Sequence, residues 1–287
     1  MIDLHIHSKY SDGTNSVKEI LTKAQNYNLD YISITDHNTC MAYEELKKIN
    51  ISNYYNGKII SGIEMNTKIM GIPIEVLGYK IDTDKMDKIV KDLYPTAKER
   101  NFIELKRIYK KCIEANIKID KKVIDEYDGK SYTSKYLHSI LTNNEDNKKL
   151  IDNKAWEDCN YFYRKYMSNP KSIFYVNMDD ILPDFKTVYS KIKQADGLLF
   201  LPHIFEYNDN SMKILNNVLN NYKIDGIECF YTTFSKEQNS FLLNLAKEQN
   251  LFISGGSDYH GDYKPNVDMA IGLGKLSIPT TIIENWK

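Results

Sequence analysis

The chain has 287 residues, of which 42% are hydrophobic and 27% are charged, as in an ordinary folded globular protein. This composition excludes disordered, collagen-like and disulfide-scaffold classes. The 38 basic and 39 acidic residues give a net charge of -1, so we expect no stable binding of duplex nucleic acid. The length fits two average domains or one α/β barrel.

Cysteine usage and hydropathy bear on the compartment. The four cysteines stand far apart without a C-x-x-C pair, which favours reduced thiols over disulfides. We find no secretory signal and no apolar run near the ~20 residues that a membrane span requires. The sequence therefore predicts a cytoplasmic protein with no membrane partner.

The first predicted element is a strand that carries two histidines. Apolar residues alternate with polar ones over residues 2–7, the period-two pattern of a strand, so His5 and His7 project from one face. Ser16 and Glu19 have the spacing of a capping box. A helix with an apolar stripe is therefore predicted to follow.

Further strands and helices alternate along the chain. Residues 31–35 form the next predicted strand, which ends before His37, and a helical stretch covers 43–49. Two short strands are predicted at 59–64 and 74–79, divided by a turn through Gly71 and Pro73. The alternation is typical of an α/β protein.

The middle of the chain interrupts this alternation. Long helical periodicities, including 95–116 and 133–141, replace the strand signals there. After it, strands are predicted at 197–201, 225–230 and 251–254, with helices ending at 194 and covering 211–221 and 235–248. We therefore predict one α/β domain in two parts, 1–83 and 184–287, with a helical insertion at 84–183. The strand–helix units favour either a barrel or a doubly wound sheet.

Imidazoles and carboxylates follow the predicted strands at the same kind of position. In α/β barrels the loops at the carboxyl ends of the strands converge on the site. Nitrogen and oxygen ligands without thiolate suit zinc, manganese or iron. A lone histidine of this kind is usually structural, but the joint pattern predicts a metal site, whose candidate ligands are His5, His7, Asp12, His37, Glu64, Glu75, His203, Asp258 and His260.

The motifs around these residues resemble those of a known family. They are His-Ile-His at 5–7, Ser-Asp-Gly at 11–13, Thr-Asp-His at 35–37, Gly-Ile-Glu at 62–64, Leu-Pro-His at 201–203 and Gly-Ser-Asp-Tyr-His-Gly at 256–261. Taken together and in this order, they look like the metal-binding motifs of the PHP (polymerase and histidinol phosphatase) metallophosphoesterases. The resemblance implies a distorted seven-stranded β/α barrel of PHP type with a helical insertion.

The resemblance also implies two or three divalent ions, manganese, zinc or iron. His5, His7, Glu64 and Asp258 would hold the first ion, Glu64 would bridge to a second that His203 also holds, and a third would lie between Asp12, His37 and His260. The catalytic group would be a metal-bound water held by His5, His7, Asp12, His37, Glu64, Asp258 and His260.

Two positions depart from the subgroup that the chain resembles most, the nucleoside 3',5'-bisphosphate phosphatases and 5'-3' exoribonucleases. Glu75 stands where these relatives usually carry histidine, and a glutamate ligand would favour harder ions. In the insertion, Ser134, Lys135 and Tyr136 replace an Arg-Pro-His run. A lysine holds phosphate as a point charge without arginine's bidentate grip.

Several residues are candidate substrate contacts. They are Lys9, Ser134, Lys135 and Tyr136. His138 is either a general acid or, on the simpler interpretation, a partly exposed helical histidine. The tyrosines of the insertion either stack nucleobases or pack in its core.

The sequence predicts a metal-dependent hydrolase of small phosphomonoesters that acts through a metal-activated water. Its substrate would be a small phosphorylated compound, plausibly the 3'-phosphate of a nucleoside 3',5'-bisphosphate or the end of a short oligonucleotide. Two alternatives stay open, a histidinol-phosphate phosphatase and a non-catalytic, metal-stabilised PHP module. An amidohydrolase is disfavoured because no predicted strand end supplies a ligating lysine.

Overall fold

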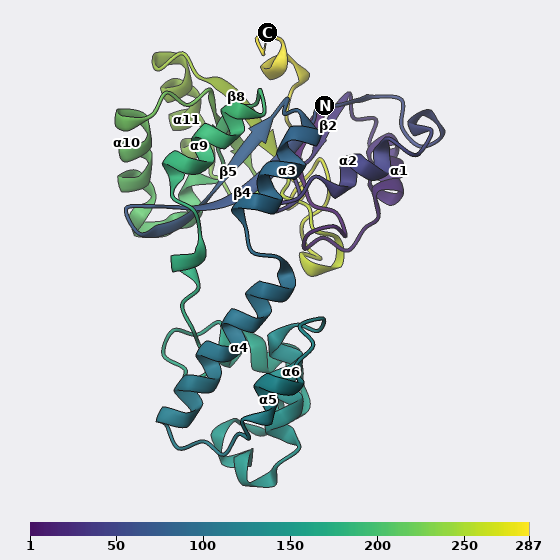
Figure 1. The fold of residues 1–287 in the computed structure, drawn as a ribbon. Coiled ribbons are helices and arrows are strands. Elements are labelled where there is room, and N and C mark those ends of the chain that lie inside the picture. The colour runs from purple at the N-terminus through teal and green to yellow at the C-terminus, as the bar shows by residue number, and fades with distance from the viewer. Residues whose placement is uncertain (287) are drawn as a thin grey trace. The chain divides into compact units, whose positions relative to one another are not determined.

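A computed structural model describes residues 1–286 of the chain. Two compact units are present, one formed by Met1–Leu93 with Leu182–Lys287 and the other by Tyr94–Ile181. The first combines strands and helices, and the second, teal in Figure 1, is built from helices. The predicted α/β class is therefore confirmed. The predicted insertion bounds of 84 and 183 stay a prediction.

The first unit contains two sheets. Its strands are β1 (Ile2–Ile6), β2 (Tyr31–Ile34), β3 (Lys58–Ile59), β4 (Gly62–Ile69), β5 (Ile72–Tyr79), β6 (Leu198–Leu201), β7 (Gly226–Tyr231) and β8 (Phe252–Gly256). β1, β2 and β3 form a parallel sheet in that order. The other sheet runs from β4 to β8, antiparallel across β4, β5 and β6 and parallel across β6, β7 and β8.

The two sheets approach each other at both edges without a continuous ladder. Single parallel bridges join Ile6 to Tyr259 and His37 to Glu64. In addition, the Tyr79 hydroxyl of β5 donates to the Leu4 carbonyl of β1 over 2.9 Å. Within residues 1–286 these contacts do not amount to a closed barrel, so the seven-stranded barrel is not confirmed.

Helices cover the sheets of the first unit. They are α1 (Val17–Asn26), α2 (Met41–Leu46), α3 (Thr83–Leu93), α9 (Phe185–Gln194), α10 (Ser211–Asn221) and α11 (Lys236–Glu248). The predicted capping box of Ser16 and Glu19 is present at the start of α1, and the apolar stripe of this helix is buried. α9 and α11 lie against the five-stranded sheet, as Figure 1 shows.

The second unit has its own core. Its helices are α4 (Ala97–Glu114), α5 (Lys122–Glu126), α6 (Thr133–Thr142), α7 (Asn153–Glu157) and α8 (Cys159–Phe162). A capping box of Thr96 and Glu99 starts α4. Tyr127 and Tyr136 stack with ring centroids 4.5 Å apart and pack with the buried residues of this unit. For these two tyrosines the core-packing interpretation holds.

Two further features of residues 1–286 relate to the predicted compartment. None of their helices has the length and apolar content to cross a bilayer. All four cysteines are free. The cytoplasmic location itself stays a prediction.

The hydroxyl of Tyr79 offers a test of how the two sheets are joined. We expect Tyr79→Phe to lower the free energy of unfolding by ~1–2 kcal/mol, because it removes a buried hydrogen bond and one partner of the Leu4 carbonyl. Urea denaturation measures the change. Tyr31→Phe is the matched control, since the Tyr31 hydroxyl accepts from the exposed Lys58 ammonium and its loss should change the stability by less than ~0.5 kcal/mol. Equal losses in the two variants would contradict the expectation.

Candidate metal centre

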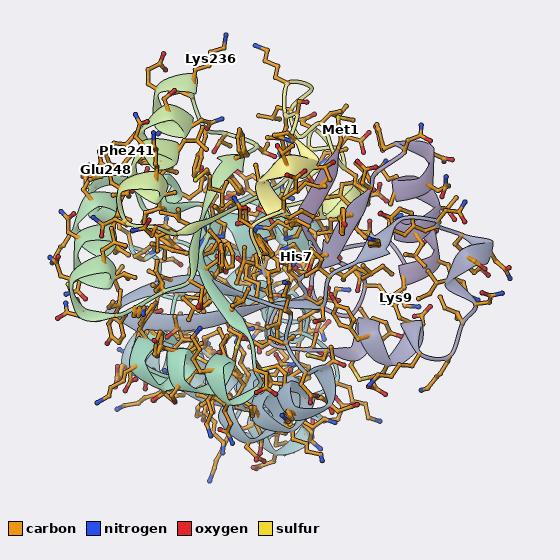
Figure 2. All side chains as sticks on the ribbon, turned by 90° about the horizontal axis from the view of Figure 1, so that it is seen from above. Met1, His7, Lys9, Lys236, Phe241 and Glu248 are labelled. Carbon is orange, nitrogen blue, oxygen red and sulfur yellow. The ribbon has the colours of Figure 1, made fainter. Side chains whose placement is uncertain are left out.

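The structure brings all nine predicted ligands into one linked cluster. In Figure 2, β1 runs from Met1 toward His7, which lies just beyond its carboxyl end. His5 lies on β1 itself, and the other residues come from the segments after β1, β2, β6 and β8 and from the β4–β5 hairpin. Three sets have ligand atoms within 4.8 Å of one another: His5 with His7 and Glu64; His37 with Glu64 and Glu75; and His7 with Asp12, His37 and His260.

Glu64 connects most of the cluster. Its Oε2 lies 3.2 Å from Nε2 of both His5 and His7 and 3.4 Å from Nδ1 of His37. Its Oε1 lies 2.9 Å from His203 Nε2. One oxygen faces three imidazoles and the other a fourth, so Glu64 could contribute to holding more than one cation, as the resemblance implies.

Asp12 gathers a second group of imidazoles. Its Oδ1 lies 3.5 Å from His7 Nδ1, and its Oδ2 lies 3.6 Å from His37 Nε2 and 3.3 Å from His260 Nε2. The Asp12 side chain is half exposed, whereas those of His7 and His260 are buried. This part of the cluster therefore faces solvent through its carboxylate.

Glu75 joins the cluster through the hairpin register. It lies opposite Asn66 on β4, and paired residues of an antiparallel ladder project to the same face, so it stands diagonal to Glu64. Its carboxylate oxygens lie 3.8 Å from His37 Nδ1 and 3.4 Å from His203 Nε2. This position fits the predicted ligand role.

Several imidazole nitrogens of the cluster are buried in a way that suits cation binding. Both nitrogens of His7 and the Nδ1 atoms of His37 and His203 are buried without a hydrogen-bond partner among residues 1–286. Yet Glu64 and Asp258 oxygens lie 3.2 Å from His7 Nε2. Buried polar atoms ordinarily have partners. Unpartnered imidazoles facing carboxylates fit zinc, manganese or iron ions bound between them.

The charges of the cluster shift its pKa values. Burial opposes protonation of His7 and His203, but nearby carboxylates outweigh it. Asp258 and Glu64 raise the pKa of His7 to about 10, and Glu64 foremost raises that of His203 to about 9. Despite burial, the imidazoles hold the pKa values of Glu64 and Asp258 well below the usual range. Burial, followed by repulsion from Glu64, raises the pKa of Glu75.

Glu228 contacts two of the predicted ligands, and the sequence analysis gave it no role. It is fully buried on β7, where its Oε1 lies 3.0 Å from His5 Nδ1 and its Oε2 accepts the His203 backbone N–H over 2.8 Å. It thus orients one predicted ligand and the backbone of another, a role that tunes metal affinity. A carboxylate inside the apolar strand Ile-Glu-Cys-Phe-Tyr is the signal that identifies it.

Two further buried carboxylates shape the loops that carry ligands. Asp36 accepts both the backbone N–H and the hydroxyl of Ser8, over 2.7 and 2.6 Å. Asp3 accepts the backbone N–H and hydroxyl of Ser257, over 2.9 and 2.6 Å, and the Ala270 N–H over 2.7 Å. These bonds set the chain directions directly after His7 and before Asp258.

Strained and crowded backbone lies beside the ligands. His203 and Asp258 have φ values of 26° and 57°, in the left-handed region that non-glycine residues seldom adopt. At Gly256 an added Cβ would lie 2.2 Å from His5 Cβ, so only glycine lets β8 approach β1 this closely. Such strain persists where the surroundings over-determine it, as at binding sites.

The predicted substrate contacts have varied surroundings. Lys9 is exposed beyond His7, with Nζ 3.6 Å from Glu45. Ser134 and Lys135 lie on α6. The Tyr136 hydroxyl donates to the Val123 carbonyl over 2.9 Å. The substrate-binding role of these four residues stays a prediction.

His138 is held within the second unit. Its Nε2 lies 2.8 Å from the Ala155 carbonyl, and its ring contacts Phe162. A ring nitrogen engaged by a backbone carbonyl suits the simpler interpretation, a partly buried helical histidine.

The chain is similar to known proteins along most of its length. The family model of the PHP domain matches residues 3–166. A 5'-3' exoribonuclease of Haemophilus influenzae is 25% identical over 278 residues, which cover 90% of this chain and 89% of that protein. A phosphoribosyl 1,2-cyclic phosphate 1,2-diphosphodiesterase of Eggerthella lenta is 21% identical over 269 residues, covering 91% and 94% of the two chains.

Solved structures share the fold. A structure named for a metal-dependent phosphoesterase of Bifidobacterium adolescentis superposes with a TM-score of 0.65 at 19% identity, covering 98% of this chain and 93% of that one. An amidohydrolase structure from Chromobacterium violaceum gives a TM-score of 0.64 at 19% identity, with coverages of 91% and 88%.

Fold and site together define a metal-dependent hydrolase of α/β class, with a cluster of side chains that could bind metal ions. The chain belongs to the PHP domain family, since the family model matches more than half of it. The prediction of a metal-dependent hydrolase of phosphate esters is confirmed at this level.

The raised imidazole pKa values predict that metal binding releases protons. Metal-free His7 and His203 are protonated at pH 7.5, but only a neutral imidazole binds a cation. We expect manganese binding to release protons, measured by calorimetry in buffers of different ionisation enthalpy. Heats that do not depend on the buffer would contradict this.

The same shifts fix the direction of the pH dependence. Their folded pKa values exceed the ordinary value of 6.5, so the stability that these imidazoles contribute to the metal-free protein is complete below pH 6.5 and lost toward pH 10. Metal affinity should instead rise with pH over that window. The thermal shift on adding manganese should therefore grow from pH 6.5 to 9.5.

Glu228 provides a test of the residues behind the ligands. We expect Glu228→Gln to weaken manganese binding ~10–100-fold, because the neutral amide no longer supports His5 as a ligand. Titration calorimetry measures the affinity. Glu248→Gln on the exposed end of α11 is the control and should bind like the unsubstituted protein. Unchanged affinity in Glu228→Gln would assign Glu228 a purely structural role.

Proposed function

We propose that this protein hydrolyses phosphomonoesters of nucleotides, namely the 3'-phosphate of nucleoside 3',5'-bisphosphates or the ends of short oligonucleotides. The observation that carries the proposal is the linked cluster of nine nitrogen and oxygen donors, open to solvent through Asp12. Support for the nucleotide class comes from the Haemophilus relative, which is named a 5'-3' exoribonuclease and aligns along nearly the whole of both chains.

The residues divide the work by position. His5, His7, Glu64 and Asp258 would hold one divalent ion, Glu64 with His203 and Glu75 a second, and Asp12, His37 and His260 a third. Bound divalent ions supply charge neutralisation of the phosphoryl oxygens and lower the pKa of a water toward neutrality. Glu228 keeps His5 oriented, and the half-exposed Asp12 marks the side from which substrate enters.

The proposal also covers the shape of the first unit and the role of the insertion. We include in it a distorted barrel formed by the two sheets, supported by the single bridges at Ile6 and His37. We also include a substrate-selecting role for the insertion at 84–183, where Lys135 is exposed on α6.

A second candidate is hydrolysis of a cyclic phosphodiester. It is favoured by the Eggerthella relative, which is named a phosphoribosyl 1,2-cyclic phosphate 1,2-diphosphodiesterase and also aligns along most of both chains. The same donor cluster serves either reaction, because both require neutralisation of a phosphoryl group and a water as nucleophile. Substrate panels therefore separate the two candidates.

We expect release of phosphate from nucleoside 3',5'-bisphosphates or short oligoribonucleotides in manganese, and its loss with chelator. The panel also includes mononucleotides, phosphoribosyl 1,2-cyclic phosphate and histidinol phosphate, assayed by phosphate release and chromatography of products. His260→Ala should lower kcat at least ~100-fold, since a lost ligand impairs the metal-dependent rate. Turnover of histidinol phosphate alone would replace the proposal, and no turnover by fully metal-loaded protein would favour the non-catalytic module.

A further inference from the structure

Lys264 contacts a predicted metal ligand, and the sequence analysis gave it no role. It follows the short helical turn Gly261–Tyr263, six residues after Asp258. Its Nζ lies 2.5 Å from Asp258 Oδ2. Its side chain is 40% exposed while that of Asp258 is 9% exposed, so the lysine reaches from solvent to the buried centre.

The two oxygens of Asp258 have different partners. Oδ1 faces the imidazoles and lies 3.6 Å from His5 Nε2, 3.2 Å from His7 Nε2 and 3.4 Å from His260 Nδ1. Oδ2 points away from them and accepts the Tyr231 hydroxyl over 2.7 Å as well as the Lys264 ammonium. Oδ1 is therefore the oxygen placed to bind a cation.

Asp258 Oδ2 has a second donor, so the Lys264 side chain can move away from it. If Lys264 moves away, Oδ2 keeps the hydroxyl of Tyr231, which is buried, so the carboxylate is not left without a donor. The Lys264 backbone stays in place because its N–H donates to the Gly261 carbonyl and its carbonyl accepts the Val267 N–H. Only the flexible side chain has to move.

The charge of the site explains where the lysine would go. Four carboxylates belong to the candidate ligands, so a phosphate dianion arriving at the centre meets them unless cations intervene. Lys9, the rim lysine predicted earlier, has its Nζ near Glu45, outside the nine ligands. Lys264 instead stands at a ligand itself.

We propose that Lys264 is a substrate-binding residue of this centre. Without substrate, the Lys264 ammonium donates to Asp258 Oδ2. When substrate binds, the side chain moves and the ammonium donates charge-assisted hydrogen bonds to the oxygens of the substrate phosphate. Tyr231 is the positioning residue that keeps Asp258 oriented throughout. The inference rests on the proposed phosphoesterase function and names a phosphate contact within it.

The test compares Lys264→Met with Tyr231→Phe, Lys264→Arg and a control, Lys275→Met, in the full chain. Lys275 is an exposed lysine of the same carboxyl-terminal segment. The readouts are manganese content, the manganese dissociation constant, the affinity of the manganese-loaded protein for inorganic phosphate by calorimetry, and KM and kcat on the best substrate.

We expect Lys264→Met to retain its manganese while phosphate affinity falls about tenfold and KM rises by a similar factor. Lys264→Arg should recover most of the phosphate affinity, and Lys275→Met should match the unsubstituted protein. Tyr231→Phe should weaken manganese binding and leave the phosphate affinity of the saturated protein unchanged. The reverse pattern, with weaker manganese binding in Lys264→Met and weaker phosphate binding in Tyr231→Phe, would contradict the proposal.

Two results would overturn it. One is manganese loss in Lys264→Met equal to that in Tyr231→Phe, which would make the lysine a second holder of Asp258. The other is unchanged phosphate affinity. Because phosphate binding is measured without turnover, a Lys264-dependent affinity in a protein that hydrolyses nothing would refute the proposed function while supporting the phosphate contact.

Discussion

The burial of Glu64 among four imidazoles is the interaction on which the rest of this structure depends. Its carboxylate is almost completely shielded from water, and an ionised carboxylate is costly to bury without partners. His5, His7, His37 and His203 supply these partners from three different strand ends. The strands must therefore converge at one edge, and their loops must turn sharply enough to present imidazoles inward.

That requirement accounts for features that otherwise destabilise a fold. The left-handed backbone at His203 and Asp258 is unfavourable for residues with a Cβ, yet it aims both side chains at the cluster. Asp3 and Asp36 are buried away from the cluster and accept hydrogen bonds from serines in the ligand-bearing loops. The network behind the ligands thus fixes loop geometry before any cation binds.

Much of the candidate site could be predicted because its signals are local. His5 and His7 share a face through the period of two, and the elements around them follow from alternation and capping. Glu228 was missed because a single acidic residue in an apolar strand has no spacing motif, and its partners His5 and His203 are distant in sequence. The pairing of β5 with β6 was also out of reach, since the two strands lie on segments separated by the insertion.

Glu75 shows how one substitution alters the electrostatics of such a cluster. A neutral imidazole at this position would add a ligand without charge, whereas a carboxylate adds repulsion against Glu64. Burial raises the pKa of Glu75, and repulsion from Glu64 raises it further. A cation bound between Glu64, Glu75 and His37 would reduce that repulsion. As a ligand, the Glu75 carboxylate would increase the charge that must be neutralised and, by adding an oxygen donor, would favour harder ions such as manganese over zinc.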